Sequence, residues 1–192
     1  MNELYEKSLH KLELDKVLVI PDKRPVHKIC EDLALDSDRA ELCRRTFTGK
    51  NYEVSTMEID RASDSYMIFT VNEILSKYKD AQLFLVIGSD MFLSFHKWYK
   101  YREIMKKCTL CVMSREDEDT VKALRSYAFS TLHIYMPSNE ANGIIISPSS
   151  PLEISSTEIR QKISAGEDVS DVLTKEAYEF IKERGMYGYA KK

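Results

Sequence analysis

The sequence has few of the residues that mark fibrous, disordered or disulfide-rich proteins. Its 192 residues include only 6 glycines, 5 prolines and 4 cysteines, against 43% hydrophobic and 31% charged residues. This balance is typical of a globular chain with its own core, and it excludes collagen-like and low-complexity classes. Four cysteines are also too few for the disulfide framework of a secreted protein of this length. We therefore expect a single domain over residues 1–192.

Long apolar runs and a strong charge of one sign are missing too. No stretch approaches the roughly 20 apolar residues of a membrane span, and the acidic, amphipathic N-terminal segment is unlike a signal peptide. Lys and Arg number 28 and Asp and Glu 31, which gives a net charge of −3. Because no basic arm or stripe stands out, we expect no nucleic-acid partner. These absences predict a cytoplasmic protein that binds neither nucleic acid nor membrane.

Cys108 and Cys111 have the C-x-x-C spacing of metal and redox motifs. They fall in an apolar segment, residues 108–113, that we interpret as a strand, and residues three apart on a strand point to opposite faces. No second C-x-x-C or nearby pair of histidines completes a zinc-ligand set. We predict that both cysteines pack in the core and that the chain has no metal site of its own.

Short apolar runs alternate with helical patterns along the chain. Strands are predicted at residues 17–20, 52–55, 82–87, 108–113, 132–135 and 143–147. Helices are predicted at about residues 2–14, 36–49, 66–78, 101–107 and 117–129, after the hydroxyl-rich segment 155–157, and towards residue 185 from a cap at 170 or 174. We expect side-chain caps at residues 36–38 and 63–65. This alternation predicts an α/β fold whose mostly parallel sheet is covered on both faces.

Polar residues gather where several of these strands end. They are His27, Lys28, Gly88, Ser89, Asp90 and Arg115. Ligands of open parallel sheets bind outside the carboxyl ends of the strands, so we expect these residues to share one edge. Cations suit a polyphosphate, and Gly88 beside Asp90 lets a ribose or base approach the backbone. The lone Trp98 suits stacking on a planar ring, although core packing for Trp98 and helix capping for Asp90 are open alternatives.

Three consecutive hydroxyl residues, Ser155, Ser156 and Thr157, precede a helical stripe that includes Ile159. Free N–H groups and the macrodipole at a helix start favour an anion, and Arg160, one turn in, can turn back towards it. The segment therefore has the layout of a phosphate site, and also that of an ordinary capped helix. Since no Ser-His-Asp set, Cys–His pair or two-metal carboxylate cluster is evident, we expect catalysis by positioning and charge stabilisation.

The motifs occur in an order and at spacings that are characteristic of one family. They are Val19-Ile20-Pro21, Pro25-Val26-His27-Lys28, Asp38-Arg39, Ser65-Tyr66, Ile87-Gly88-Ser89-Asp90 with Trp98, Ser114-Arg115, Ile154-Ser155-Ser156-Thr157-Glu158-Ile159-Arg160 and Met186-Tyr187. Over nearly its whole length the chain resembles bacterial nicotinate mononucleotide adenylyltransferase, of the nucleotidyltransferase superfamily. The resemblance implies a Rossmann-like fold and transfer of AMP from ATP, with Mg²⁺, to nicotinate mononucleotide. The products would be deamido-NAD and pyrophosphate, in NAD biosynthesis.

The resemblance also implies roles for particular residues. ATP would be bound by Gly88, Ser89, Ile154, Ser155, Ser156, Thr157 and Arg160. The mononucleotide would be bound by His27, Ser65, Tyr66, Asp90 and Trp98. In these roles Asp90 would contact the ribose hydroxyls and Trp98 would stack on the pyridine ring. Lys28 and Arg115 would be the catalytic cations that steer phosphate charge.

The chain departs from the family pattern in two places. Met67 stands where the family usually has threonine, which bears on the preference for acid over amide. The opening strand and turn, G-x-F-x-P-x-H-x-G-H, would end at about Met1, so we expect an N-terminally truncated domain that lacks its first strand and has weak or no transferase activity. Alternatives are an adenylyltransferase for nicotinamide mononucleotide or phosphopantetheine, and a non-catalytic nucleotide-binding protein. The sequence leaves a homo-oligomer possible.

Overall fold

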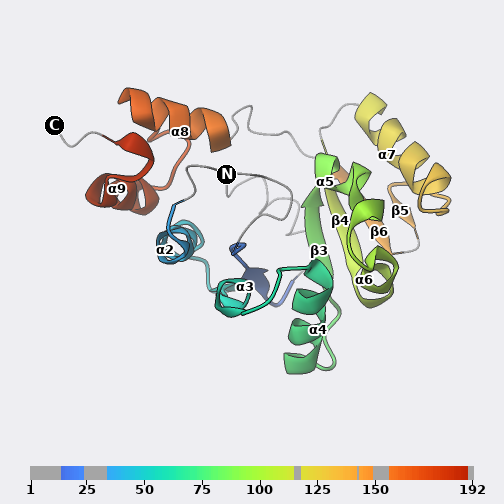
Figure 1. Ribbon diagram of the computed structural model, residues 1–192. Helices are drawn as coiled ribbons and strands as arrows, with labels where there is room; N and C mark the ends of the chain where they lie inside the picture. Colours follow the sequence, from blue (N-terminus) through green and yellow to red (C-terminus); the bar gives the residue numbers. More distant parts are fainter. Residues whose placement is uncertain (1–13, 24–33, 115–117, 142, 149–155, 190–192) are drawn as a thin grey trace. The chain divides into compact units, whose positions relative to one another are not determined.

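The computed structural model describes residues 14–23, 34–114, 118–141, 143–148 and 156–189. The chain forms two compact units, the first within Met1–Ser65 and Leu152–Lys192 and the second within Tyr66–Pro151. Each unit has a sheet of its own, and helices accompany both sheets (Figure 1). The predicted α/β class with mostly parallel strands is confirmed.

The sheet of the second unit has the strand order β3-β4-β6-β5. Its parallel strands are β3 (Phe84–Gly88), β4 (Thr109–Ser114) and β6 (Ile144–Pro148), and the two-residue β5 (Glu140–Ala141) pairs antiparallel with β6. The register sets Gly88 opposite Met113, and Ser114 opposite Pro148. The carboxyl ends of these three strands therefore lie along one edge, as the sequence predicted for this part of the chain.

Five helical segments accompany this sheet. They are α4 (Met67–Lys77), α5 (Ser89–Leu93), the 3₁₀ turn η1 (Phe95–Lys97), α6 (Tyr101–Lys107) and α7 (Glu118–Ser130). Helix α4 packs beside α6, and α5 packs beside α7. Segments α5, η1 and α6 lie between the parallel strands β3 and β4, and α7 lies between β4 and the β5–β6 pair, so the parallel pairing of β3 with β4 follows from the alternation seen in the sequence.

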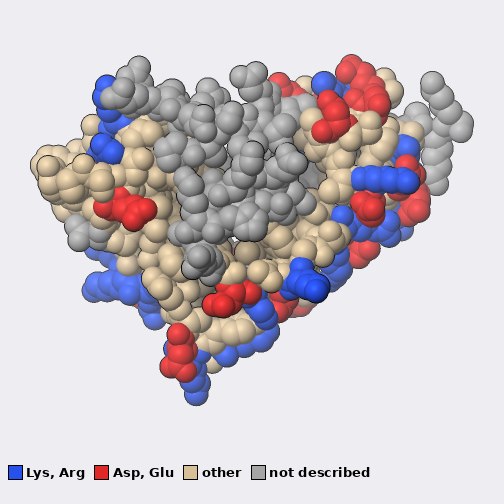
Figure 2. Space-filling model, turned by 180° about the vertical axis from the view of Figure 1, so that it is seen from behind, with Lys and Arg blue, Asp and Glu red and all other residues tan. Residues whose placement is uncertain are grey.

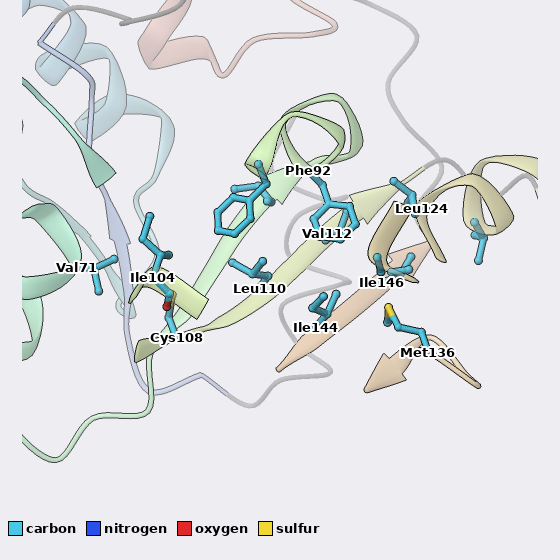
Figure 3. Close-up of a cluster of buried hydrophobic side chains, with 14 of the residues drawn as sticks. Val71, Phe92, Ile104, Cys108, Leu110, Val112, Leu124, Met136, Ile144 and Ile146 are labelled. Carbon is cyan, nitrogen blue, oxygen red and sulfur yellow. The ribbon is translucent and has the colours of Figure 1, made fainter. Parts of the chain in front are cut away.

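The core of the second unit lies on one face of its sheet. Residues two apart on a strand share a face, so Leu110 and Val112 of β4 align with Ile144 and Ile146 of β6. Figure 3 shows these side chains together with Phe92 of α5 and Leu124 of α7. All six are 2% exposed or less, and the helices that carry the loops at the strand ends are thus anchored on the sheet.

The first unit combines a two-stranded parallel sheet with a helical cluster. Its elements are β1 (Val17–Val19), α2 (Asp36–Thr46), β2 (Tyr52–Val54), α3 (Met57–Asp60), α8 (Ser156–Ala165), α9 (Lys175–Arg184) and the 3₁₀ turn η2 (Met186–Gly188). Ile159 and Ile163 of α8 pack against Phe180 and Ile181 of α9. This contact fixes α8 on the helical cluster and leaves its N-terminal hydroxyls exposed.

Several helix ends follow from residues that the sequence analysis identified. The side chain of Thr174 caps α9 by accepting a hydrogen bond from the N–H of Ala177 at 3.3 Å. Gly166 and Gly185 follow α8 and α9 with φ of +74° and +60°, a conformation that glycine adopts without a Cβ penalty. These predicted stops are confirmed.

Other predictions about the elements are wrong. The N-cap residues of α2 and α4 are Leu35 and Tyr66, without side-chain caps, in place of the polar caps expected at residues 36–38 and 63–65. Residues 132–135 form no strand, because His133 has φ of +60° and the N–H of Ile134 bonds to the carbonyl of Ala128 at 2.9 Å. These residues therefore bond to the C-terminal end of α7 and do not join the sheet.

Within the part of the chain that the structure describes, β3 pairs with a strand on one side only, and so does β1. The helix predicted at residues 2–14 lies outside the described residues. The additional strand that the family pattern suggests, and the single-domain organisation over residues 1–192, stay predictions. No described helix has the length and apolar character needed to span a membrane. On the face shown in Figure 2, Lys and Arg lie among Asp and Glu.

Candidate functional site

The predicted site residues fall into three groups. His27, Lys28, Arg115, Ile154 and Ser155 lie outside the described residues. Tyr66, Gly88, Ser89, Asp90 and Trp98 belong to the second unit. Ser65, Ser156, Thr157 and Arg160 belong to the first unit, and the geometry of each unit is described separately.

Gly88 ends β3 and is the N-cap residue of α5, and Ser89 and Asp90 form the first turn of that helix. A Cβ built on Gly88 would lie only 2.7 Å from Oδ1 of Asp90, so the carboxylate of Asp90 folds back over the Gly88 backbone. Gly88 is needed for this close approach rather than for its backbone angles, since its φ is −75°. Asp90 remains exposed and presents a carboxylate at the carboxyl end of β3.

Trp98 follows directly after η1, and its N–H donates to the carbonyl of Phe95 at 2.9 Å. Its ring lies 5.1 Å from the fully buried ring of Phe95, centroid to centroid, and is partly exposed. Trp98 thus packs against the core and still reaches the surface. This placement is compatible with both alternatives that the sequence left open for it.

Three aromatic rings meet where α4 begins. Tyr66 lies 4.8 Å from Tyr99 and 5.9 Å from Phe69 between ring centroids, and Phe69 and Tyr99 are 6.1 Å apart. Phe69 and Tyr99 are 38% and 47% exposed. Tyr66 was predicted as a site residue and Tyr99 was not, although Tyr99 directly follows the predicted Trp98 in the sequence.

Two of the three hydroxyl residues of the predicted phosphate site are described at the start of α8. Ser156 and Thr157 are exposed in its first turn, and Nη2 of Arg160 donates to Oγ1 of Thr157 at 3.3 Å. The guanidinium therefore turns back towards the helix N-terminus, where first-turn N–H groups have no partner within their own helix. A cation that turns back towards a helix N-terminus suits an anion.

A second guanidinium acts on the same region of the first unit. Burial raises the pKa of Tyr187, and the positive charges of Arg160 and Arg39 partly offset that shift, so both arginines lie near its hydroxyl. Nη2 of Arg39 donates to Asp36 at 2.6 Å, while its buried Nε makes no hydrogen bond to the described residues. The influence of both Arg39 and Arg160 on Tyr187 was not predicted, because it depends on residues distant in sequence.

Cys108 and Cys111 are buried free thiols, as predicted from the strand pattern. Burial raises the pKa of each thiol to about 11. Both side chains are therefore protonated at neutral pH, which is unsuitable for a nucleophile or a metal ligand. Among the described residues, no group of three or more His, Cys, Asp or Glu side chains is placed to hold a metal ion.

Comparison with known sequences decides the family. The profile of the cytidylyltransferase-like family matches residues 3–162. The chain belongs to the cytidylyltransferase-like family. It is 30% identical over 177 residues to a probable nicotinate-nucleotide adenylyltransferase of Fusobacterium nucleatum, covering 91% of this chain and 86% of the relative. A protein of the same name from Clostridium tetani is 29% identical over 185 residues, covering 94% and 88%.

Solved structures agree on the fold. A nicotinic acid mononucleotide adenylyltransferase of Plasmodium falciparum, solved in complexes with APC and with NaAD, has a TM-score of 0.63 at 12% identity. The alignment covers 97% of this chain and 91% of that one. The resemblance seen in the sequence, and the nucleotidyltransferase type of fold that it implied, are confirmed.

Proposed function

We propose that this chain transfers the adenylyl group of ATP to nicotinate mononucleotide. A phosphate oxygen of the mononucleotide attacks the α-phosphorus of ATP, the bond from that phosphorus to the oxygen bridging to the β-phosphorus breaks, and deamido-NAD and pyrophosphate result. The observation that carries the proposal is the Asp90 carboxylate closed over Gly88 at the carboxyl end of β3, in a chain whose relatives have this name.

The residues of the second unit suit the nucleoside part of the mononucleotide. A carboxylate accepts hydrogen bonds from vicinal ribose hydroxyls, and the Asp90 carboxylate is exposed at a strand end. Trp98 and the rings of Tyr66 and Tyr99 supply apolar faces for a pyridine ring. In the first unit, the buried Ser65 hydroxyl, which makes no hydrogen bond to the described residues, suits a polar group of a substrate.

The residues of the first unit suit the phosphates of ATP. The Arg160 fork, the Thr157 hydroxyl and the amides at the start of α8 neutralise and orient phosphate oxygens. Negative charge is carried by the phosphate oxygens during in-line displacement at the α-phosphorus, so fixed cations lower the barrier without a general base. Lys28 and Arg115 stay proposed as further cations of this kind.

A divalent cation accompanies ATP in this proposal, and we propose Mg²⁺. The described residues include no cluster of metal-ligating side chains, which fits an ion that arrives on the ATP phosphates. The ion supplies charge neutralisation when bound. Orientation of the nucleotide is assigned to the protein side chains above.

The proposal includes a preference for the acid over the amide mononucleotide. Met67 is the first residue of α4, so its N–H is one of the amides that the helix itself leaves unpaired. A carboxylate is favoured at such a position by the amides and the helix dipole. The methionine that replaces the usual threonine is compatible with this role, because the N–H is the group that acts.

The proposal is tested by pyrophosphate release with ATP, Mg²⁺ and one of three acceptors: nicotinate mononucleotide, nicotinamide mononucleotide or phosphopantetheine. We expect nicotinate mononucleotide to have the highest kcat/KM. Asp90→Asn should lower that value, whereas Asp80→Asn, an exposed position before β3, is the matched control. A preference for another acceptor would replace the proposed substrate, and binding without turnover would favour a non-catalytic nucleotide-binding protein.

A further inference from the structure

Tyr127, near the C-terminal end of α7, contacts the segment that connects Asp90 with Trp98. Its hydroxyl oxygen accepts a hydrogen bond from the backbone N–H of His96 at 3.0 Å and lies 2.9 Å from Nδ1 of the same residue. Its ring meets Phe92 edge-on, with centroids 5.2 Å apart. One side chain thus contacts both α5 and η1 from a different helix.

The segment held in this way is too short to keep its own conformation. Helix α5 has 5 residues and η1 has 3, and helices of such length are not stable in isolation. Phe92 and Phe95 anchor it, since both rings are fully buried. The two buried rings hold the segment against the core. A directional hydrogen bond is needed to fix the orientation of the turn that leads into Trp98.

The hydroxyl of Tyr127 can make both contacts at once. A phenol has one hydrogen to donate and lone pairs to accept with, so it accepts from the His96 N–H and donates to an unprotonated Nδ1. Burial raises the pKa of Tyr127, which keeps the hydroxyl protonated at neutral pH. A phenylalanine at this position would keep the ring contact with Phe92 and leave the His96 N–H without this acceptor.

We propose that Tyr127 is a positioning residue for the mononucleotide: through His96 it orients the turn that presents Trp98. Tyr127 contacts Phe92 and His96, which lie between Asp90 and Trp98 in the sequence, and is not itself a residue of the proposed substrate site. The inference rests on the proposed function for its kinetic consequence. Its structural consequence, the orientation of Trp98, is independent of that function.

The test compares Tyr127→Phe with Tyr101→Phe. The Tyr101 ring lies edge-on to Phe95 at 6.0 Å, and its hydroxyl makes no hydrogen bond to the described residues, so it is a matched loss of one hydroxyl from the same core cluster. We expect Tyr127→Phe to raise KM for nicotinate mononucleotide about fivefold, the scale of one hydrogen bond. KM for ATP should be unchanged, and so should both constants in Tyr101→Phe.

Substitutions of His96 separate positioning from general stability. Asparagine can place an amide oxygen near the position of Nδ1, so His96→Asn should keep KM for the mononucleotide within about twofold of the original, whereas His96→Leu should raise it. A merely structural role of Tyr127 would lower kcat per total protein, as the folded fraction falls, and leave both KM values in place. That result would overturn the proposal.

Tryptophan fluorescence tests the positioning role without requiring enzymatic turnover. Trp98 is the only tryptophan, so the protein's tryptophan emission and its quenching by acrylamide report on this side chain alone. Tyr127→Phe should shift the emission to longer wavelength and increase quenching, and Tyr101→Phe should do neither. If the original chain shows no turnover, the proposed function fails and the fluorescence still decides. Unchanged emission and quenching in Tyr127→Phe would refute the positioning role.

Discussion

Replacement of Gly88 by alanine should damage the substrate site and spare the fold. The new Cβ would lie 2.7 Å from Oδ1 of Asp90, whereas ordinary contacts begin at 3.4 Å, so the carboxylate must move by about 0.7 Å. The contact is with the end of an exposed, flexible side chain, and a φ of −75° suits alanine. We therefore expect the free energy of unfolding to change by less than about 0.5 kcal/mol.

The effect on catalysis should be much larger. A hydrogen bond to a charged group contributes about 1.5–3 kcal/mol. If displacement of the carboxylate removes its bond to a ribose hydroxyl, kcat/KM for nicotinate mononucleotide falls by roughly 10- to 150-fold. Asp90→Ala should cost about as much, because it removes the same interaction by another route.

A double-mutant cycle tests whether Gly88 acts through Asp90. Gly88→Ala should have little further effect on kcat/KM in a chain that already carries Asp90→Ala, because no carboxylate remains to be displaced. The assays are steady-state pyrophosphate release and urea denaturation of all four chains. Equal losses in both backgrounds, or destabilisation by more than about 2 kcal/mol in Gly88→Ala, would refute the reasoning.

Three further predictions concern the α8 start, the α9 cap and the buried thiols. In the pyrophosphate assay, Arg160→Met should raise KM for ATP about tenfold. Arg160→Lys should raise it less, because lysine keeps the positive charge without the planar guanidinium. Equal KM values in the two variants would contradict this prediction. Thr174→Ala should lower the free energy of unfolding by about 1 kcal/mol in urea, through loss of the N-cap bond to Ala177, and an unchanged midpoint would argue against it. Burial raises the thiol pKa of Cys108 and Cys111 from 9.0 to about 11, so the unfolded chain releases these protons first and stability should fall as pH rises between those values. Urea denaturation across that pH range measures the fall, and an unchanged free energy of unfolding would contradict it. At pH 8, iodoacetamide should alkylate these thiols more slowly in the folded chain than in urea-unfolded chain.

Much of the fold could be predicted because the signals are local. The continuous apolar runs near residues 84 and 109 give strands, and the glycines after α8 and α9 give their ends. The predicted polar cap of α2 failed because its carboxylates have other partners. Asp36 pairs with Arg39, and the Asp38 carboxylate pairs with Arg184 at 3.0 Å, so these carboxylates bond to guanidiniums in place of backbone amides.

The strand predicted at residues 132–135 shows the limit of periodicity. Leu132 and Ile134 alternate with polar residues as in a strand, and both pack against the core cluster of the second unit. The alternation therefore correctly indicates that these two side chains contact the core. The left-handed backbone at His133 and the bond from Ile134 to Ala128 decide against a strand, and neither is visible in the pattern.

The candidate site also has contacts that could be predicted from the sequence and contacts that could not. The Gly88–Asp90 approach and the return of Arg160 towards Thr157 were predictable, because each joins residues within one turn. The contacts of Tyr127 with His96 and of Tyr99 with Tyr66 were not, since they depend on how helices pack on the sheet. The convergence of both halves of the site at one edge stays a prediction.

The fate of the α-phosphate tests the central claim most directly. The chain is incubated with nicotinate mononucleotide, Mg²⁺ and ATP labelled at the α-phosphorus, and the products are separated. Adenylyl transfer predicts that the label appears in deamido-NAD in equal amount to the pyrophosphate released, and that Asp90→Asn lowers both together. Label found in AMP or ADP, with none in a dinucleotide, would contradict the account.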